Sequence, residues 1–155
     1  MPTWDRVYHS DQDDLYTLRY VVASGMSVAG LLPLCGVASR ERPGAAVTTI
    51  VVLFVLMWQA MLWRITLVGV YVSDYGIKIR MVLRTRVIPW SHVSRAWAGQ
   101  AVNFDAWQIW VSTRDPARDF ETPIWRRGSQ ARHRNRIVLA PEEFAAVLAT
   151  LNSHR

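Results

Sequence analysis

The sequence has a single cysteine, Cys35, and none of the residue spacings that support common kinds of catalysis. One thiol excludes a disulfide within the chain and a paired-cysteine zinc site. The four histidines lack metal-ligand spacing, and there is no H-E-x-x-H motif. A G-x-S-x-G nucleophile elbow and a G-x-x-x-x-G-K-[ST] phosphate loop are also absent. We therefore expect a protein that is not an enzyme and that uses no metal or other cofactor.

Charged residues are missing from two apolar stretches, residues 20–38 and 45–63. Each is about nineteen residues long, close to the length at which a helix crosses a hydrocarbon core about 30 Å thick. Backbone amides in lipid must be satisfied within the segment, so each stretch is predicted to be a helix. With residues 39–44 as an external polar loop, the two form a transmembrane hairpin. The alternative is a pair of buried helices, which 155 residues could hardly surround.

The two predicted helices differ in how readily they should insert. Residues 45–63 are rich in Val, Ile and Leu, which each favour insertion. Glycine, serine and proline dilute residues 20–38, where small residues recur at a spacing that lets another helix approach closely. The expected helix-packing face, including one polar residue able to hydrogen-bond across an interface, consists of Ala23, Gly25, Ser27, Ala29 and Gln59.

Positive charge is unevenly distributed around these stretches. The external loop contains only two cations, Arg40 and Arg42, and their charge is partly offset by Glu41. Most of the arginines and the single lysine lie on the other side of the two stretches. The positive-inside rule therefore predicts a multi-pass protein of the cytoplasmic membrane with both termini in the cytoplasm. Residues 1–19 are then a cytoplasmic tail, too acidic for a signal peptide. The membrane interface is expected at Arg19, Tyr20, Trp63 and Arg64.

The remaining residues, 64–155, are predicted to form a cytoplasmic domain of short strands. Residues 65–72 predict a strand, residues 73–76 a turn, and residues 77–84 a second strand with alternating apolar and polar side chains. Further strands are expected at residues 86–89, 95–98, 106–113, 120–125 and 137–140. Pro141 begins an amphipathic helix with a stripe of Phe144, Val147, Leu148 and Leu151. The predicted fold class is α+β: a membrane hairpin, then an antiparallel sandwich or barrel capped by the C-terminal helix.

Two segments of this domain carry a family resemblance: Gly-Val-Tyr-Val-Ser-Asp-Tyr-Gly-Ile-Lys-Ile-Arg from Gly69, and a Pro-Trp-Ser-x-Val corner at residues 89–93. In these the chain resembles the pleckstrin-homology (PH)-like membrane proteins of actinobacteria, of the group named for low-molecular-weight protein antigen 6. The resemblance implies two packed antiparallel sheets closed by a helix, and a binding or scaffolding role. Eukaryotic relatives bind inositol phosphates through basic residues of the first hairpin loop. The matching loop here has Asp74 and no cation.

The formal net charge is +6, and nine of the 18 Lys and Arg residues fall in two clusters. Either cluster is a candidate contact for anionic lipid headgroups or an acidic partner, since each cation near an anionic leaflet contributes about 1 kcal/mol. The alternative is a merely solvated basic surface, and no stacking motif points to nucleic acid. The first cluster is Lys78, Arg80, Arg84 and Arg86, and the second is Arg126, Arg127, Arg132, Arg134 and Arg136.

Tryptophan is common, and one indole is predicted on a polar strand face. In residues 106–113, Trp107, Ile109 and Val111 should point to one side, and Trp110 to the other. Trp110 is therefore the candidate exposed aromatic contact, with packing over an open barrel edge as the alternative.

Two functions remain. One is a non-enzymatic membrane-anchored PH-like binding or scaffold protein that contacts a protein partner or anionic lipid. The other is an accessory subunit, packed through its hairpin into a larger membrane protein complex. The expected partners are the membrane with its anionic lipid headgroups, and either a membrane protein complex or further copies of the chain in a homo-oligomer.

Overall fold

The computed structural model describes residues 3–9, 16–39, 44–128 and 136–154. The chain divides into two compact units. Thr17–Thr66 form one unit, which we call the helical hairpin. Met1–Tyr16 and Leu67–Arg155 form the other, which we call the sheet unit.

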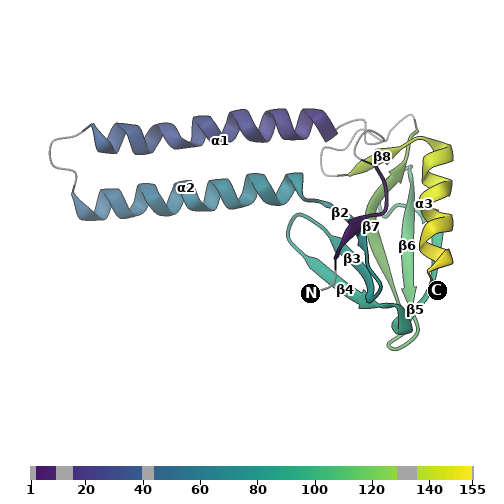
Figure 1. The fold of residues 1–155 in the computed structure, drawn as a ribbon. Coiled ribbons are helices and arrows are strands. Elements are labelled where there is room, and N and C mark those ends of the chain that lie inside the picture. The colour runs from purple at the N-terminus through teal and green to yellow at the C-terminus, as the bar shows by residue number, and fades with distance from the viewer. Residues whose placement is uncertain (1–2, 10–15, 40–43, 129–135, 155) are drawn as a thin grey trace. The chain divides into compact units, whose positions relative to one another are not determined.

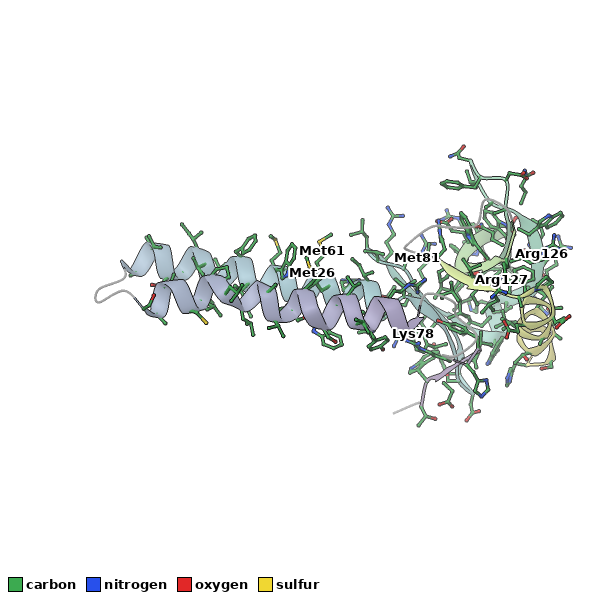
Figure 2. The ribbon with its side chains drawn as sticks, turned by 90° about the horizontal axis from the view of Figure 1, so that it is seen from above. Met26, Met61, Lys78, Met81, Arg126 and Arg127 are labelled. Carbon is green, nitrogen blue, oxygen red and sulfur yellow. The ribbon has the colours of Figure 1, made fainter. Side chains whose placement is uncertain are left out.

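The helical hairpin consists of α1 (Tyr16–Ala38) and α2 (Ala45–Thr66), which lie side by side and run antiparallel (Figure 1). Both helices are long and apolar enough to cross a membrane. Their apolar side chains are mostly exposed, with Leu32 at 65% and Leu53 at 60%. Met26 and Met61 are among the side chains that project from the hairpin (Figure 2). The prediction of two apolar helices packed as a hairpin is confirmed.

Contacts between α1 and α2 hold the hairpin together. The Gln59 side-chain amide donates to the backbone carbonyl of Ser27 at 2.9 Å, and the Trp58 indole N–H donates to that of Met26 at 3.2 Å. Gly30 is buried against Trp58, and a Cβ atom added there would lie 2.5 Å from Cδ1 of the indole. The absence of a side chain at Gly30 therefore lets Trp58 lie flat on α1.

Gly30→Ala should destabilise the hairpin by about 2 kcal/mol, because the added methyl displaces Trp58 from a close-packed contact. Gly25→Ala is the matched control, since nothing lies within 4 Å of a Cβ atom at Gly25. Titration of the full chain from mild detergent into sodium dodecyl sulfate, followed by circular dichroism, measures both. Equal losses for the two variants would contradict the packing role of Gly30.

Sheet A of the sheet unit has the order β1 (Asp5–Arg6), β2 (Gly69–Val72), β3 (Gly76–Arg80), β4 (Thr85–Pro89), with all neighbours antiparallel. The β3–β4 turn is closed by the N–H of Met81, which donates to the carbonyl of Arg84 at 2.8 Å. The predicted strand over residues 77–84 therefore ends early, at Arg80. Side chains in a reverse turn do not alternate between the two faces of a sheet as they do in a strand. Leu83 lies in the turn and is therefore exposed.

Two predictions about the edges of sheet A are corrected. Ile65 and Thr66 belong to α2, so the first strand does not begin at residue 65 but at Gly69. β-branched residues are frequent in both membrane helices and strands, and composition did not separate the two here. The tail was predicted to lie outside the domain, yet β1 pairs with β2, and Tyr8 is buried in the core.

Sheet B has the order β5 (Val93–Gln100), β6 (Trp107–Thr113), β7 (Arg118–Arg126), β8 (Ile137–Leu139). The short 3₁₀ helix η2 (Trp90–His92) leads into it and forms the predicted corner. The first three strands are antiparallel, but β8 runs parallel to β7, which corrects the prediction of a wholly antiparallel domain. A parallel pair needs a long connection rather than a tight turn, and residues 127–136 provide one.

The β6–β7 pairing contains an irregularity between Gln108 and Trp110. Thr122 compensates for it: its hydroxyl donates to the carbonyl of Ile109 at 2.8 Å and accepts from the N–H of Ile124 at 3.3 Å. Pro123 has no N–H for the ladder, so the threonine side chain takes over part of the strand pairing.

The main core lies between the sheets and under α3 (Pro141–Ser153), which packs on sheet B (Figure 1). Phe144, Val147 and Leu151 are the buried face of α3, and Leu148 packs partly buried beside them. Asn152 of α3 also accepts from the N–H of Ala96 at 3.1 Å and donates to its carbonyl at 3.0 Å. These bonds cover part of the outer edge of β5. A second, smaller core contains Ala101, Ala106, Trp125 and Val138.

Candidate functional site

A groove with a volume of about 1260 Å³ opens on the sheet unit, beside the β3–β4 turn. Its walls come from the β3–β4 turn with the neighbouring parts of β3 and β4, from β6 and β7, from the loop between β5 and β6, and from Arg136 just before β8. The chemical character of the groove is set by four arginines, two carboxylates and four aromatic side chains. These are Arg84, Arg86, Arg118, Arg136, Asp119, Glu121, Phe104, Trp110, Phe120 and Trp125.

Three of the arginines have no acidic partner among the described residues. Within the part of the chain that the structure describes, Arg84, Arg86 and Arg118 form no ion pair with a carboxylate. All three residues are exposed. The guanidinium of Arg86 lies over the ring of Phe120, with Cζ 4.5 Å from the ring centroid. These cations are therefore available to an anionic ligand.

The fourth arginine, Arg136, helps to build the wall. One of its nitrogens lies 3.5 Å from a carboxylate oxygen of Glu121, and another lies 3.9 Å from the sulfur of Met81. Its guanidinium also lies 5.2 Å from the ring centroid of Trp125. Of the two carboxylates, Glu121 is thus paired with Arg136, and Asp119 accepts a hydrogen bond from the hydroxyl of Ser112. The groove keeps an excess of positive charge.

Strand register explains why Arg86 faces the groove. Arg86 of β4 is opposite Ile79 of β3, and directly paired residues of antiparallel strands point to the same side. Ile79 is a core residue, so the side chain of Arg86 lies on the inner side of sheet A, toward Phe120 of sheet B. Lys78 and Arg80 alternate with Ile79 and lie on the opposite face, where Lys78 is 5.2 Å from the ring centroid of Trp4.

The structure therefore divides the first predicted cluster. Arg84 and Arg86 lie in the groove, whereas Lys78 and Arg80 do not line it. Arg118 joins the groove although sequence reasoning did not select it. Its signal was weak, because it stands in a polar segment between two predicted strands, and only the tertiary structure places it in the same groove as Arg84.

The second predicted cluster is divided as well. Arg136 lies in the groove, while Arg126 lies over the ring of Trp107, 5.6 Å from its centroid. The backbone N–H of Arg127 donates to the carbonyl of Leu139 at 2.7 Å. Figure 2 shows Arg126 and Arg127 on a different part of the sheet unit from Lys78. Arg132 and Arg134 lie outside the described residues.

The predicted exposed aromatic contact, Trp110, is half-buried and stacks on Trp97 with ring centroids 6.0 Å apart. Its indole nitrogen is buried without a hydrogen-bond partner. The exposed tryptophan of β6 is instead Trp107, at 48%, whereas Gln108 is fully buried. The irregularity beside Gln108 breaks the simple alternation on which the prediction rested.

The predicted membrane residues have the following places in the helical hairpin. Arg19 and Tyr20 lie in the early part of α1, and Trp63 and Arg64 in the last part of α2, so the four mark one end of the antiparallel pair. On the predicted packing face, Ala23 is buried, Ser27 and Gln59 are half-buried, and Gly25 and Ala29 are exposed.

Comparison of the sequence with models of known protein families, with curated proteins and with solved structures finds no match. Within residues 3–9, 16–39, 44–128 and 136–154, no three His, Cys, Asp or Glu side chains come together as metal ligands. The groove itself presents guanidinium groups, which bind anionic oxygens, beside aromatic and apolar side chains.

Proposed function

We propose that this chain is a membrane-anchored, non-enzymatic binding or scaffold protein of PH-like fold. It works at the inner face of the cytoplasmic membrane, and its basic groove holds an anionic group of a lipid or of a protein partner. The observation that carries the proposal is the set Arg84, Arg86 and Arg118, three exposed arginines in one groove that have no acidic partner among the described residues. Guanidinium groups bind phosphate and carboxylate oxygens with two parallel hydrogen bonds, which favours such ligands.

Other observations support the remaining parts of the proposal. Two four-stranded sheets with a C-terminal helix on sheet B agree with what the PH-like resemblance implies. The exposed apolar surface of α1 and α2 favours anchoring in lipid, because such a surface in water would drive association. The balance of charge around the two helices favours a cytoplasmic sheet unit.

Replacing Arg84, Arg86 and Arg118 together by glutamine should weaken the binding of anionic probes about 100-fold at low ionic strength. Each cation contributes about 1 kcal/mol near anionic groups, and 1.4 kcal/mol corresponds to a factor of ten. The measurement is microscale thermophoresis of the full chain in phosphatidylcholine nanodiscs. The probes are water-soluble dioctanoyl phosphatidylglycerol, for lipid, and a polyglutamate peptide, for an acidic partner.

A charge-matched control is available on the same unit. Arg95, Arg114 and Arg126 are exposed and do not line the groove. Their triple replacement by glutamine removes the same charge and should change binding by only a few-fold. If both triple variants lose the same affinity for both probes, net charge rather than the groove binds the ligand, and the proposal for this site is wrong.

The second candidate is an accessory subunit of a larger membrane protein complex. Gly25 and Ala29 favour it, because these small residues are exposed on α1 while Ala23 and Gly30 face the hairpin interior. A partner helix could approach closely there. Purification of the full chain in mild detergent separates the candidates: stoichiometric membrane partners support the subunit, and a monomer or homo-oligomer that binds the anionic probes supports the binding protein.

A further inference from the structure

The β3–β4 turn, Met81–Arg84, presents an apolar side chain at its tip. Leu83 is 85% exposed, a larger fraction than that of any apolar side chain recorded as exposed on α1 or α2. Val82 beside it is half-buried and packs at the edge of the core. The turn is well defined, since the Met81 N–H to Arg84 carbonyl bond closes it. The fold of the sheet unit does not bury this leucine, so its side chain is available for contact with another apolar phase.

Two arginines that line the same groove follow this leucine in the chain. Arg84 follows it directly, and Arg86 lies two residues further along β4. Neither pairs with a carboxylate in the part of the chain that the structure describes. An apolar side chain with arginines just behind it matches the profile of a bilayer surface, where acyl chains lie beneath a layer of anionic phosphates.

Chain connectivity and strand register show at which end of sheet A this turn lies. Only Leu67 and Val68 separate Thr66, the last residue of α2, from Gly69, the first of β2. Three residue steps span about 10 Å at full extension. Gly69 is opposite Arg80, after which the β3–β4 turn begins. The turn therefore lies at the end of sheet A where the chain enters it from α2.

The other turn of sheet A provides an internal contrast. Val72 is opposite Ile77, which places the Ser73–Gly76 turn at the far end of β2 and β3. That turn has Asp74 and the exposed Tyr75 in place of arginine and leucine. The two ends of one sheet thus differ in charge: the end joined to α2 is cationic, and the other carries an acid.

We propose that the Met81–Arg84 turn inserts Leu83 into the interface of the membrane that anchors the chain, and that the groove beside it takes the headgroup of an anionic phospholipid. Arg84 and Leu83 both line the groove, so the turn that enters the interface also forms the groove's rim. The lipid phosphate then meets Arg84, Arg86 and Arg118 while its acyl chains stay in the bilayer. This inference rests on the proposed anchoring function and names the lipid as the ligand.

Site-directed labelling of the full chain tests the proposal. Cys35→Ser removes the single native thiol, and Leu83→Cys, Tyr75→Cys and Leu53→Cys each add one labelling site. Each protein is labelled with an environment-sensitive nitrobenzoxadiazole dye and reconstituted in vesicles of phosphatidylcholine and phosphatidylglycerol. Quenching by nitroxide-bearing lipids reports contact with lipid, and quenching by aqueous iodide reports contact with water.

The expected result is lipid quenching at Leu83→Cys several-fold stronger than at Tyr75→Cys, with a blue-shifted emission. Adding Arg84→Gln and Arg86→Gln to the Leu83→Cys protein should remove most of this difference. If dyes at Leu83→Cys and Tyr75→Cys are equally accessible to iodide while Leu53→Cys is quenched by lipid, the inference is overturned and anchoring stands. If the dye at Leu53→Cys also contacts water, the anchoring proposal itself fails.

Discussion

Trp125→Ala should destabilise the sheet unit by about 4 kcal/mol, the largest effect that we expect from a single substitution in this chain. Trp125 is 1% exposed and is the largest member of the second core. Phe104 packs on it with ring centroids 5.3 Å apart, and Ala101 and Ala106 pack in the same cluster. Removing the indole leaves a cavity that these small residues cannot refill.

The substitution also removes a buried hydrogen bond. The indole N–H of Trp125 donates to the side-chain oxygen of Gln108 at 3.1 Å, and Gln108 is fully buried. Without Trp125 this oxygen loses its donor in an apolar site, and an unmet buried polar group costs about 1–3 kcal/mol. The groove should suffer as well, because Trp125 and the guanidinium over it form part of its wall.

The measurement for Trp125→Ala is urea unfolding of the full chain in mild detergent, followed by amide hydrogen exchange in β5, β6 and β7. Trp107→Ala is the matched control, since Trp107 is about half exposed on a neighbouring strand and outside the second core. It should lower the free energy of unfolding by less than about 1 kcal/mol. Similar losses for the two tryptophans would show that the second core does not stabilise the unit.

Gly76→Ala should destabilise the sheet unit by about 3 kcal/mol, at the upper end of the range for overpacking. Gly76 begins β3 and is opposite Pro89 of β4. A Cβ atom there would lie 2.8 Å from the Cα atom of Pro89 and closer still to the carbonyl oxygen of Ile88. Both are backbone atoms of a paired strand, so relief requires β4 to move away from β3 rather than a side chain to rotate.

Gly128→Ala is the control for Gly76→Ala, because none of the described residues lies within 4 Å of a Cβ atom at Gly128. It should leave the free energy of unfolding within about 0.5 kcal/mol of that of the parent chain. Urea unfolding of the full chain in mild detergent compares the two. A neutral Gly76→Ala would mean that the two strands do not approach each other as closely as their register requires.

The helical hairpin and the sheet unit each have stabilising contacts of their own. The hairpin carries exposed apolar side chains and has its own interhelical hydrogen bonds. The sheet unit has two cores of its own. Residues of both cores also line the groove, and among the described residues three of its arginines pair with no carboxylate, which leaves them available to a ligand.

Local sequence was sufficient for the helical hairpin and for the C-terminal helix. The lengths and composition of residues 20–38 and 45–63 predicted α1 and α2, and the stripe Phe144, Val147 and Leu151 predicted the buried face of α3. These features depend on residues near one another in the chain. Two-residue β1 was missed because so short a strand has no periodicity to read.

The candidate site could be predicted only in part. The sequence selected Arg84, Arg86 and Arg136 by charge, but it also selected Lys78, Arg80, Arg126 and Arg127, and it passed over Arg118. Charge is visible in a sequence, whereas the face of a strand on which a side chain lies depends on where turns and irregularities fall. The turn after Arg80 and the irregularity beside Gln108 changed the predicted faces.

By itself, therefore, the sequence determined that this protein has two uncharged helices of membrane-spanning length and a basic domain of strands closed by a helix. Those properties follow from the composition of each segment and from the periodicity of its apolar residues, and both depend only on residues near one another in the chain. Only the tertiary structure decided that Arg84, Arg86 and Arg118 share a groove and that Leu83 stands exposed at its rim. Strand pairing brings together residues far apart in the chain, and its register is fixed by the packing of the whole core.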